Sequence, residues 1–186
     1  MEQNTLNKNI WNAAGTAGLA LGAISSAYLF AGQLIAGNLS PATLWQQVLS
    51  LILWGLKFAM CILIMKLSMA KYAYETKASD KKQIFKMGVA AALLSSLVYS
   101  GFYLANMLYI SPEFYNMVFE TTINEMSASI DSNSAAALEK LKAYLPQIVF
   151  LSNFIYCFLF GTVLSAILSR NISPKDPLAE FKTEQK

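Results

Sequence analysis

The stretch that decides the fold is residues 84–110, IFKMGVAAALLSSLVYSGFYLANMLYI, in which Lys86 is the only charged residue. A bilayer core is about 30 Å thick, and a helix rising about 1.5 Å per residue crosses it in roughly 20 residues. The stretch is longer than that and contains no proline. It therefore predicts a helix that spans a membrane.

Three further blocks meet the same requirement, at residues 10–36, 44–70 and 147–169. The first has Lys8 before it, as a secretory signal would, but its apolar run is long and no A-x-A cleavage site follows, so we interpret it as a retained helix. The segment 37–43 is too short for anything but an antiparallel hairpin. The sequence predicts a single membrane domain over residues 1–186, an all-α, integral membrane, antiparallel four-helix bundle.

Composition supports a membrane location and removes several kinds of chemistry. Of the 186 residues, 55% are hydrophobic and 13% charged, whereas soluble domains carry about a quarter charged residues. Histidine is absent, which excludes His-ligated metals and Ser-His or Cys-His nucleophile pairs. Cys61 and Cys157 lie in apolar blocks without CxxC spacing, so neither a disulfide framework nor a zinc site is indicated. The net charge of +3 is too small for a nucleic-acid-binding surface.

Basic residues are distributed unequally between the two sides of the predicted bundle. Four spans place the N-terminus, the loop 71–83 and the tail 170–186 on one side, and the loop 111–145 on the other. The first side holds most of the 14 basic residues: Lys8, Lys66, Lys71, Lys77, Lys81, Lys82, Lys86, Arg170, Lys175, Lys182 and Lys186. The other side holds Lys140 and Lys142, and Lys57 lies between the two sides. The positive-inside rule therefore predicts a multi-pass membrane protein with both termini, the loop 71–83 and the tail in the cytoplasm.

Small residues recur at every fourth position in three of the predicted spans. Helices in lipid associate through close packing, and such strips let their backbones approach. Close helix contacts are expected at six of these positions: Gly18, Gly22, Ser96, Ser100, Gly161 and Ser165. Packing inside one bundle explains the strips, and a strip that faces outward to seat a partner subunit is the alternative.

The loop 111–145 is expected to form a short amphipathic helical hairpin on the outer face of the bundle. Ser111-Pro112-Glu113 is typical of an N-cap, a first-turn proline and an acidic first turn. Apolar residues then recur at spacings of three and four as far as Ile130. Asp131-Ser132-Asn133 is expected to break this helix, Ser134 to cap a second one, and Pro146 to begin the fourth span.

Lys57 is the one deep ionisable residue in the predicted spans. A lysine near the centre of a membrane helix costs about 2.5–3.5 kcal/mol on insertion scales, which makes it a candidate functional residue. The spans contain no Asp or Glu to pair with it, so its partners are expected among hydroxyls such as Tyr99, amides, carbonyl groups, water, or an added ligand or subunit. The amides Asn106 and Asn153 are therefore candidate functional or partner-binding residues together with Lys57. Two interpretations stay open. Lys57 is either a tolerated structural residue or a binding residue for an anionic lipid or a partner's carboxylate.

No pattern in the chain indicates catalysis. HExxH, GxSxG, glycine-rich phosphate loops and close pairs of membrane carboxylates are all missing from the sequence. We therefore expect no enzymatic activity, no cofactor and no metal site, and interpret the chain as an accessory or scaffolding subunit of a larger membrane complex. The alternative is a small self-associating transporter or channel in which Lys57 lines an anion path.

Three short strings resemble a known family. They are Ile110-Ser111-Pro112-Glu113-Phe114 after the aromatic-rich third span, FGTVLSAI at residues 160–167, and IFKMG at residues 84–88 after a lysine-rich loop. In them the chain is similar to an uncharacterised Bacteroidetes family of four-helix integral membrane proteins, the domain-of-unknown-function family 4199. The resemblance implies an inner membrane in a Gram-negative cell. It brings no reaction, ligand or catalytic residue.

Overall fold

The computed structural model describes residues 2–38, 44–76, 80–126 and 132–172. Every regular element in this part of the chain is helical. In order these are α1 (Glu2–Asn38), α2 (Leu44–Glu75), α3 (Lys81–Ala105), the π-helical turn η1 (Asn106–Ile110), α4 (Pro112–Met126) and α5 (Ser132–Asn171). The prediction of an all-α fold is confirmed.

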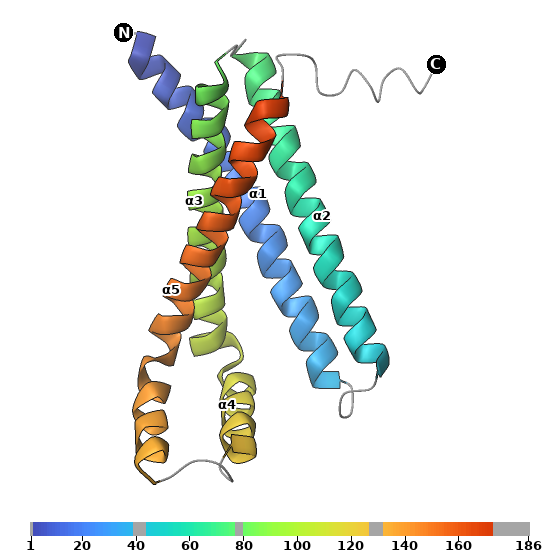
Figure 1. Cartoon of the computed structure of the whole chain (residues 1–186), viewed down its shortest axis with the longest axis vertical. Helices are drawn as coiled ribbons and strands as arrows, with labels where there is room; N and C mark the ends of the chain where they lie inside the picture. The colour runs from blue at the N-terminus through green and yellow to red at the C-terminus, as the bar shows by residue number, and fades with distance from the viewer. Residues whose placement is uncertain (1, 39–43, 77–79, 127–131, 173–186) are drawn as a thin grey trace.

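Within the described ranges, four helical stretches are long and apolar enough to cross a membrane: Asn9–Ile35, Gln47–Glu75, Lys81–Ile110 and Leu141–Asn171. Consecutive stretches run in opposite directions (Figure 1). We call the end of the bundle at Asn9, Glu75, Lys81 and Asn171 the near end, and the opposite end the far end. The predicted helical membrane bundle is therefore confirmed. The second helix continues beyond Ala70 because Tyr72 and Ala73 are buried against its neighbours.

Helix α3 lies at the centre of the arrangement. It packs along α1 on one side and along α5 on the other, whereas α2 packs mainly against α1 and only slightly against α3 and α5. The most closely associated pair, α1 and α3, runs in the same direction (Figure 1). The core accordingly lies around α3: in the apolar 18-residue stretch of each span, 33% of the residues are buried in α3, compared with 6% in α2.

Small residues bring α1 and α3 together. A Cβ atom added to Gly18 would lie 2.7 Å from Leu94 Cβ, and one added to Gly22 would lie 2.6 Å from Val98 Cγ1. Distances under about 3 Å between such atoms do not occur in packed helices, so only glycine fits at these two positions without moving the backbones apart.

The contact between α3 and α5 is built in the same way. A Cβ atom on Gly161 would lie 2.6 Å from Ala92 Cβ, and one on Gly88 would lie 2.7 Å from Ser165 Oγ. Ser165 and Ser96 are buried, and both satisfy their hydroxyls on their own helices. Ser100 is fully buried. All six residues expected at helix contacts therefore lie inside the bundle.

Helix α5 differs from the expectation around Pro146. It is one helix from Ser132 to Asn171, with Pro146 inside it, instead of a short helix followed by a separate span. Proline removes one backbone donor and crowds the preceding turn, which bends a helix without ending it when the neighbouring turns are held. Figure 1 shows this bend in the ribbon of α5. Ser134, predicted to be a cap, lies within the helix, as do Ser132 and Asn133 of the predicted break, while Asp131 lies outside the described residues.

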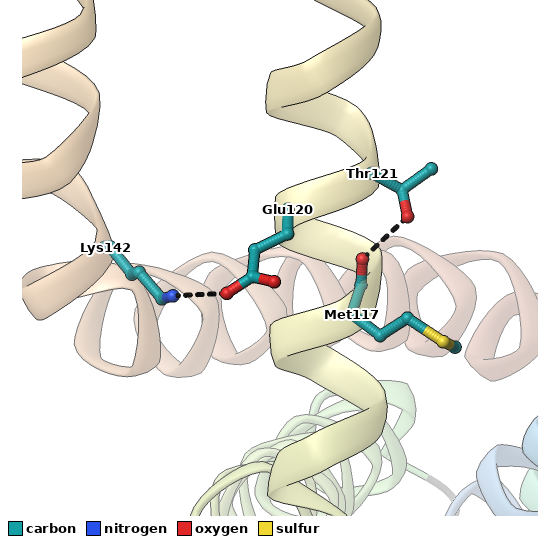
Figure 2. A network of polar contacts seen from close by, with 4 residues as sticks. All are labelled: Met117, Glu120, Thr121 and Lys142. Carbon is teal, nitrogen blue, oxygen red and sulfur yellow. Dashed lines mark hydrogen bonds and ion pairs between the residues drawn. The ribbon is translucent and has the colours of Figure 1, made fainter.

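Helix α4 and the beginning of α5 form the expected hairpin beyond the far end. Helix α4 begins at Pro112 with Glu113 in its first turn, as predicted. Figure 2 shows Glu120 of α4 paired with Lys142 of α5, with Nζ 3.3 Å from Oε1. On the same helix, the Thr121 hydroxyl donates to the carbonyl oxygen of Met117 over 2.8 Å (Figure 2). The ion pair between Glu120 and Lys142 joins the two helices of the hairpin at their exposed surface, where such a pair contributes about 0.2–1 kcal/mol.

Candidate functional site

Lys57 lies deep within α2. It is about 27 Å from the near end of its span at Glu75 and about 15 Å from the far end at Gln47, at a helical rise of about 1.5 Å per residue. The side chain is half-buried. A lysine side chain reaches only part of either distance, so the ammonium group is held among protein and lipid rather than at a membrane surface.

Two tyrosine rings hold this ammonium group. Nζ of Lys57 lies 4.8 Å from the ring centroid of Tyr28 on α1 and 4.8 Å from that of Tyr99 on α3. A cation over an aromatic face gains about 2 kcal/mol or more when it is shielded from water. No carboxylate pairs with Lys57 in the described part of the chain. The rings therefore offset part of the cost of the buried charge, but they leave its charge unneutralised.

The contact with Tyr99 differs in kind from the expectation. The sequence suggested that the Tyr99 hydroxyl is the partner, whereas the structure uses the face of the ring. Tyr28 was not predicted. A signal for it exists, because in an antiparallel hairpin of α1 and α2 the residues about equally far from the connection come side by side, which places Tyr28 near Lys57.

A cavity of about 120 Å³ adjoins Lys57. Helices α2 and α5 form its walls, and residues of α1 and α3, such as Ser25 and Ser95, form its floor. Trp54 and Tyr156 stand at the rim and are 54% and 69% exposed, so the cavity opens toward the lipid side of the bundle. Its volume is close to that of apolar cavities of about 150 Å³ that take up a benzene-sized molecule.

Aromatic contacts keep α2 and α5 apart at this level. The ring of Phe58 on α2 stacks on Trp54 with centroids 5.5 Å apart and meets Phe160 of α5 at 5.0 Å. Both cysteines, Cys61 and Cys157, are free thiols that line the same cavity. The site thus combines one cation with aromatic faces and weakly polar thiols, a setting suited to an anionic group carried on an apolar body.

Asn106 lies in a different cluster, at the far end. Its side chain is fully buried, and its Nδ2 donates to the Tyr115 hydroxyl over 3.0 Å. Gln33 Nε2 donates to the same hydroxyl over 3.0 Å, so three elements, α1, η1 and α4, meet at Tyr115. Burial raises the pKa of the Tyr115 phenol above its ordinary value, and nearby Tyr103 acts in the same direction. Asn106 is therefore a structural residue of this cluster and is not a hydrogen-bond partner of Lys57.

The π-helical turn explains how Asn106 reaches Tyr115. The Ser111 amide donates to the carbonyl oxygen of Asn106, five residues earlier, over 2.8 Å. Such a wide turn inserts one residue into the helical spacing and redirects the side chains that follow. Gln33 and Tyr115 were missed from the sequence. The available signal was a single amide at the end of an apolar stretch, which requires a polar partner when it is buried.

Asn153, the third candidate, lies half-buried on α5, and its side chain forms no hydrogen bond with another described residue. In the described ranges, no group of three or more Cys, Asp or Glu side chains is placed to hold a metal ion. Of the three candidates, Lys57 is therefore the one that the structure places beside a cavity.

A model of the DUF4199 family, described as a protein of unknown function, matches residues 16–170. The chain belongs to this family, and the resemblance seen in the sequence is confirmed. Apart from residues 9–15 and Asn171, the match includes the four described stretches that are able to span a membrane, and it includes all the residues that line the cavity at Lys57. A comparison with curated proteins found no match, and neither did a comparison with solved structures.

Proposed function

We propose that this member of the DUF4199 family is a non-enzymatic accessory subunit of a membrane complex, and that Lys57 binds an acidic side chain on a membrane helix of its partner. The observation that carries the proposal is the Lys57 site itself. A cation lies deep in a span, beside a cavity that opens toward lipid, with no carboxylate partner among the described residues.

The size of the site favours a single side chain as the occupant. The cavity of about 120 Å³ accommodates a carboxylate with its short stem but not a phospholipid head group and its acyl chains. Charges attract each other far more strongly in an apolar medium than in water, so an acidic residue would neutralise Lys57 at the depth where each charge alone is costly. Trp54 and Tyr156 at the rim would then contact the partner helix on either side.

The test compares Lys57→Met with Lys66→Met. Lys66 is an exposed lysine on the same helix that does not line the cavity, so it controls for the lost charge. After purification of the full chain from native membranes in mild detergent, the Lys57→Met protein should lose one specific co-purifying membrane protein that the wild type and Lys66→Met retain. Introducing Glu at position 57 and Lys at the partner's acidic position should restore the association.

Unchanged co-purification in Lys57→Met, together with a more stable isolated protein, would contradict the proposal. Removal of an unpaired membrane cation is expected to stabilise the isolated chain by at most about 2.5–3.5 kcal/mol, the cost of a central lysine on insertion scales. Lys57 would then be a tolerated residue without a binding role.

We place the protein in a bacterial inner membrane with the near end in the cytoplasm. Among the described residues, the near end carries Lys8, Lys71, Lys81, Lys82, Lys86 and Arg170, whereas the hairpin at the far end carries Lys140 and Lys142. This asymmetry supports the orientation by the positive-inside rule. Four lysines used in the sequence argument lie outside the described residues, namely Lys77, Lys175, Lys182 and Lys186.

Cysteine labelling tests this orientation. Thr122 on α4 and Lys82 on α3 are both exposed, and the two native cysteines lie within the spans. In cells with an intact inner membrane, Thr122→Cys should react with an impermeant maleimide and Lys82→Cys should not, relative to the unmodified chain. The reverse pattern would overturn the orientation.

The second candidate function is a self-associating channel with Lys57 on an anion path. It is favoured by the position of Lys57 on a cavity, but the neighbouring side chains are mostly aromatic or aliphatic and include no second cation for a moving anion. Flux through liposomes separates the two functions. We expect no anion flux above that of empty liposomes, and a flux that Lys57→Met abolishes would establish the channel instead.

A further inference from the structure

A second cavity lies at the near end, far from Lys57. It has a volume of about 560 Å³ and separates the first turns of the α1 span from the last turns of α2. Small side chains on α1, among them Ala13, Ala17 and Ala20, leave the room for it. Since the α1 span begins at Asn9 and the α2 span ends at Glu75, the cavity lies at the level where a bilayer has its head groups.

The wall formed by α2 carries opposite charges next to each other. Lys71 Nζ lies 3.8 Å from Glu75 Oε1, and the two side chains are 69% and 58% exposed. At this distance the two groups attract each other without a hydrogen bond, so the donors of Lys71 and the acceptors of Glu75 stay available. The opposite wall, on α1, offers the amides of Asn9 and Asn12.

Tyr72 provides a second and independent sign of a ligand. Its side chain is 2% exposed and lines the cavity, and its hydroxyl has no hydrogen-bond partner among the described residues. The nearby threonines donate their hydroxyl protons elsewhere, Thr76 to the Tyr72 carbonyl oxygen and Thr16 to that of Asn12, and neither lies in hydrogen-bond geometry to the Tyr72 hydroxyl. A buried hydroxyl without a partner is unfavourable, so an acceptor supplied by a ligand would satisfy it.

We infer that this cavity binds a phosphoethanolamine group. The phosphate would accept from Lys71 and from the Tyr72 hydroxyl, and the ammonium group would donate to Glu75. A zwitterion matches this wall better than an anion does, because an added anion alone would lie against the Glu75 carboxylate. The same chemistry is presented by the head group of an ethanolamine phospholipid and by free phosphoethanolamine, and the depth of the cavity favours the phospholipid.

The test uses the full chain in detergent and measures binding by native mass spectrometry. The ligands are short-chain phosphatidylethanolamine, short-chain phosphatidylglycerol and free phosphoethanolamine. We expect phosphatidylethanolamine to bind more tightly than phosphatidylglycerol by about tenfold, the effect of one charge-assisted interaction. Binding of free phosphoethanolamine at comparable affinity would assign the site to a soluble ligand of the same chemistry.

Three variants locate the binding. Lys71→Met should weaken it about tenfold, whereas Lys66→Met, which removes an exposed charge outside the cavity, should change it by less than about twofold. Tyr72→Phe should also weaken binding about tenfold while leaving the stability of the unliganded protein unchanged or higher, because the hydroxyl has no partner in the described residues. Equal binding by Lys71→Met and the wild type, or tighter binding of phosphatidylglycerol, would overturn the assignment.

Discussion

The helix contacts on the two faces of α3 are close, whereas α2 and α5 are separated by a cavity, and residues of different size account for this difference. Against α1, Leu94 and Val98 of α3 fit onto glycines of α1, where an added Cβ has no room. Against α5, α3 packs equally closely through Gly88 and Ala92. Between α2 and α5, the rings of Trp54, Phe58 and Phe160 hold the helices apart beside Lys57 and leave a cavity. Small residues thus hold this bundle together, and large ones create the one deep binding site proposed for it.

The largest effect is expected from placing a large side chain in the α3–α5 contact. Gly161→Leu should destabilise the fold by about 3 kcal/mol, because even its Cβ would meet Ala92 Cβ at 2.6 Å and alanine has no flexible end that moves away. Unfolding of the detergent-solubilised protein by heat or by denaturing detergent measures the change.

Gly55→Leu is the matched control. Gly55 lies on α2, and a Cβ atom added to it would have no neighbour within 4 Å. Replacing Gly55 by leucine should therefore leave the stability of the fold unchanged or slightly higher. Equal losses for Gly55→Leu and Gly161→Leu would remove the distinction between the packed faces of α3 and the lipid-facing surface of α2.

A smaller loss is expected at the far end, where hydrogen bonds replace close packing. Tyr115→Phe removes the acceptor shared by Gln33 and the fully buried Asn106, and it should cost about 1–3 kcal/mol, the range for leaving buried polar groups unpaired. Circular dichroism of α-helix loss on heating measures it. A cost near zero would show that α1, η1 and α4 are not joined through this hydroxyl.

The same residue gives a dependence on pH. Since the pKa of Tyr115 is raised in the folded state, the native protein holds the phenol proton more tightly than the unfolded chain does. This contribution to stability is complete below a pH of about 10 and is lost as the pH rises further. The difference in stability between wild type and Tyr115→Phe should therefore shrink above that pH.

The smallest effect concerns the rings around Lys57. Tyr99→Leu should cost about 1 kcal/mol more in the wild type than in the Lys57→Met protein, since the cation–π contact exists only in the former. Tyr99→Phe should show little of this coupling, because the contact uses the ring rather than the hydroxyl. Equal costs of Tyr99→Leu in both backgrounds would contradict the contact.

The sequence predicts the helices well because a helix that crosses a membrane needs only a run of about 20 consecutive apolar residues. The length of residues 84–110 and their near absence of charge identify a membrane-spanning helix without any knowledge of the helices that pack against it. The small-residue strips similarly identify Gly18 and Gly161 as contact points. The sequence could not say that α1 and α3 form the closest pair, because the one small-residue strip predicted on α3 is equally able to receive any of its neighbours.

The surroundings of Lys57 and Asn106 were harder to predict, for a physical reason. Both depend on which side chains meet across helices, and a rotation of one helix by a single residue, about 100°, exchanges every partner. The π-helical turn at Asn106 introduces such a shift, which is why Gln33 and Tyr115 were not found. Pro146 was misjudged because its effect depends on whether adjacent turns are held by packing.

The parallel pairing of α1 with α3 has a consequence for biosynthesis. The partners of Gly22 on α3 lie about 75 residues further along the chain, which a ribosome reaches roughly 4 to 15 s later at about 5–20 residues per second. During that interval α1 has only α2 beside it, and the glycine surface of α1 stays covered by lipid. Gly161 of α5 in turn follows its partner Ala92 by about 70 residues. Assembly therefore proceeds from a loose hairpin to the finished bundle in two later steps, first when α3 enters the membrane and then when α5 closes on its other side.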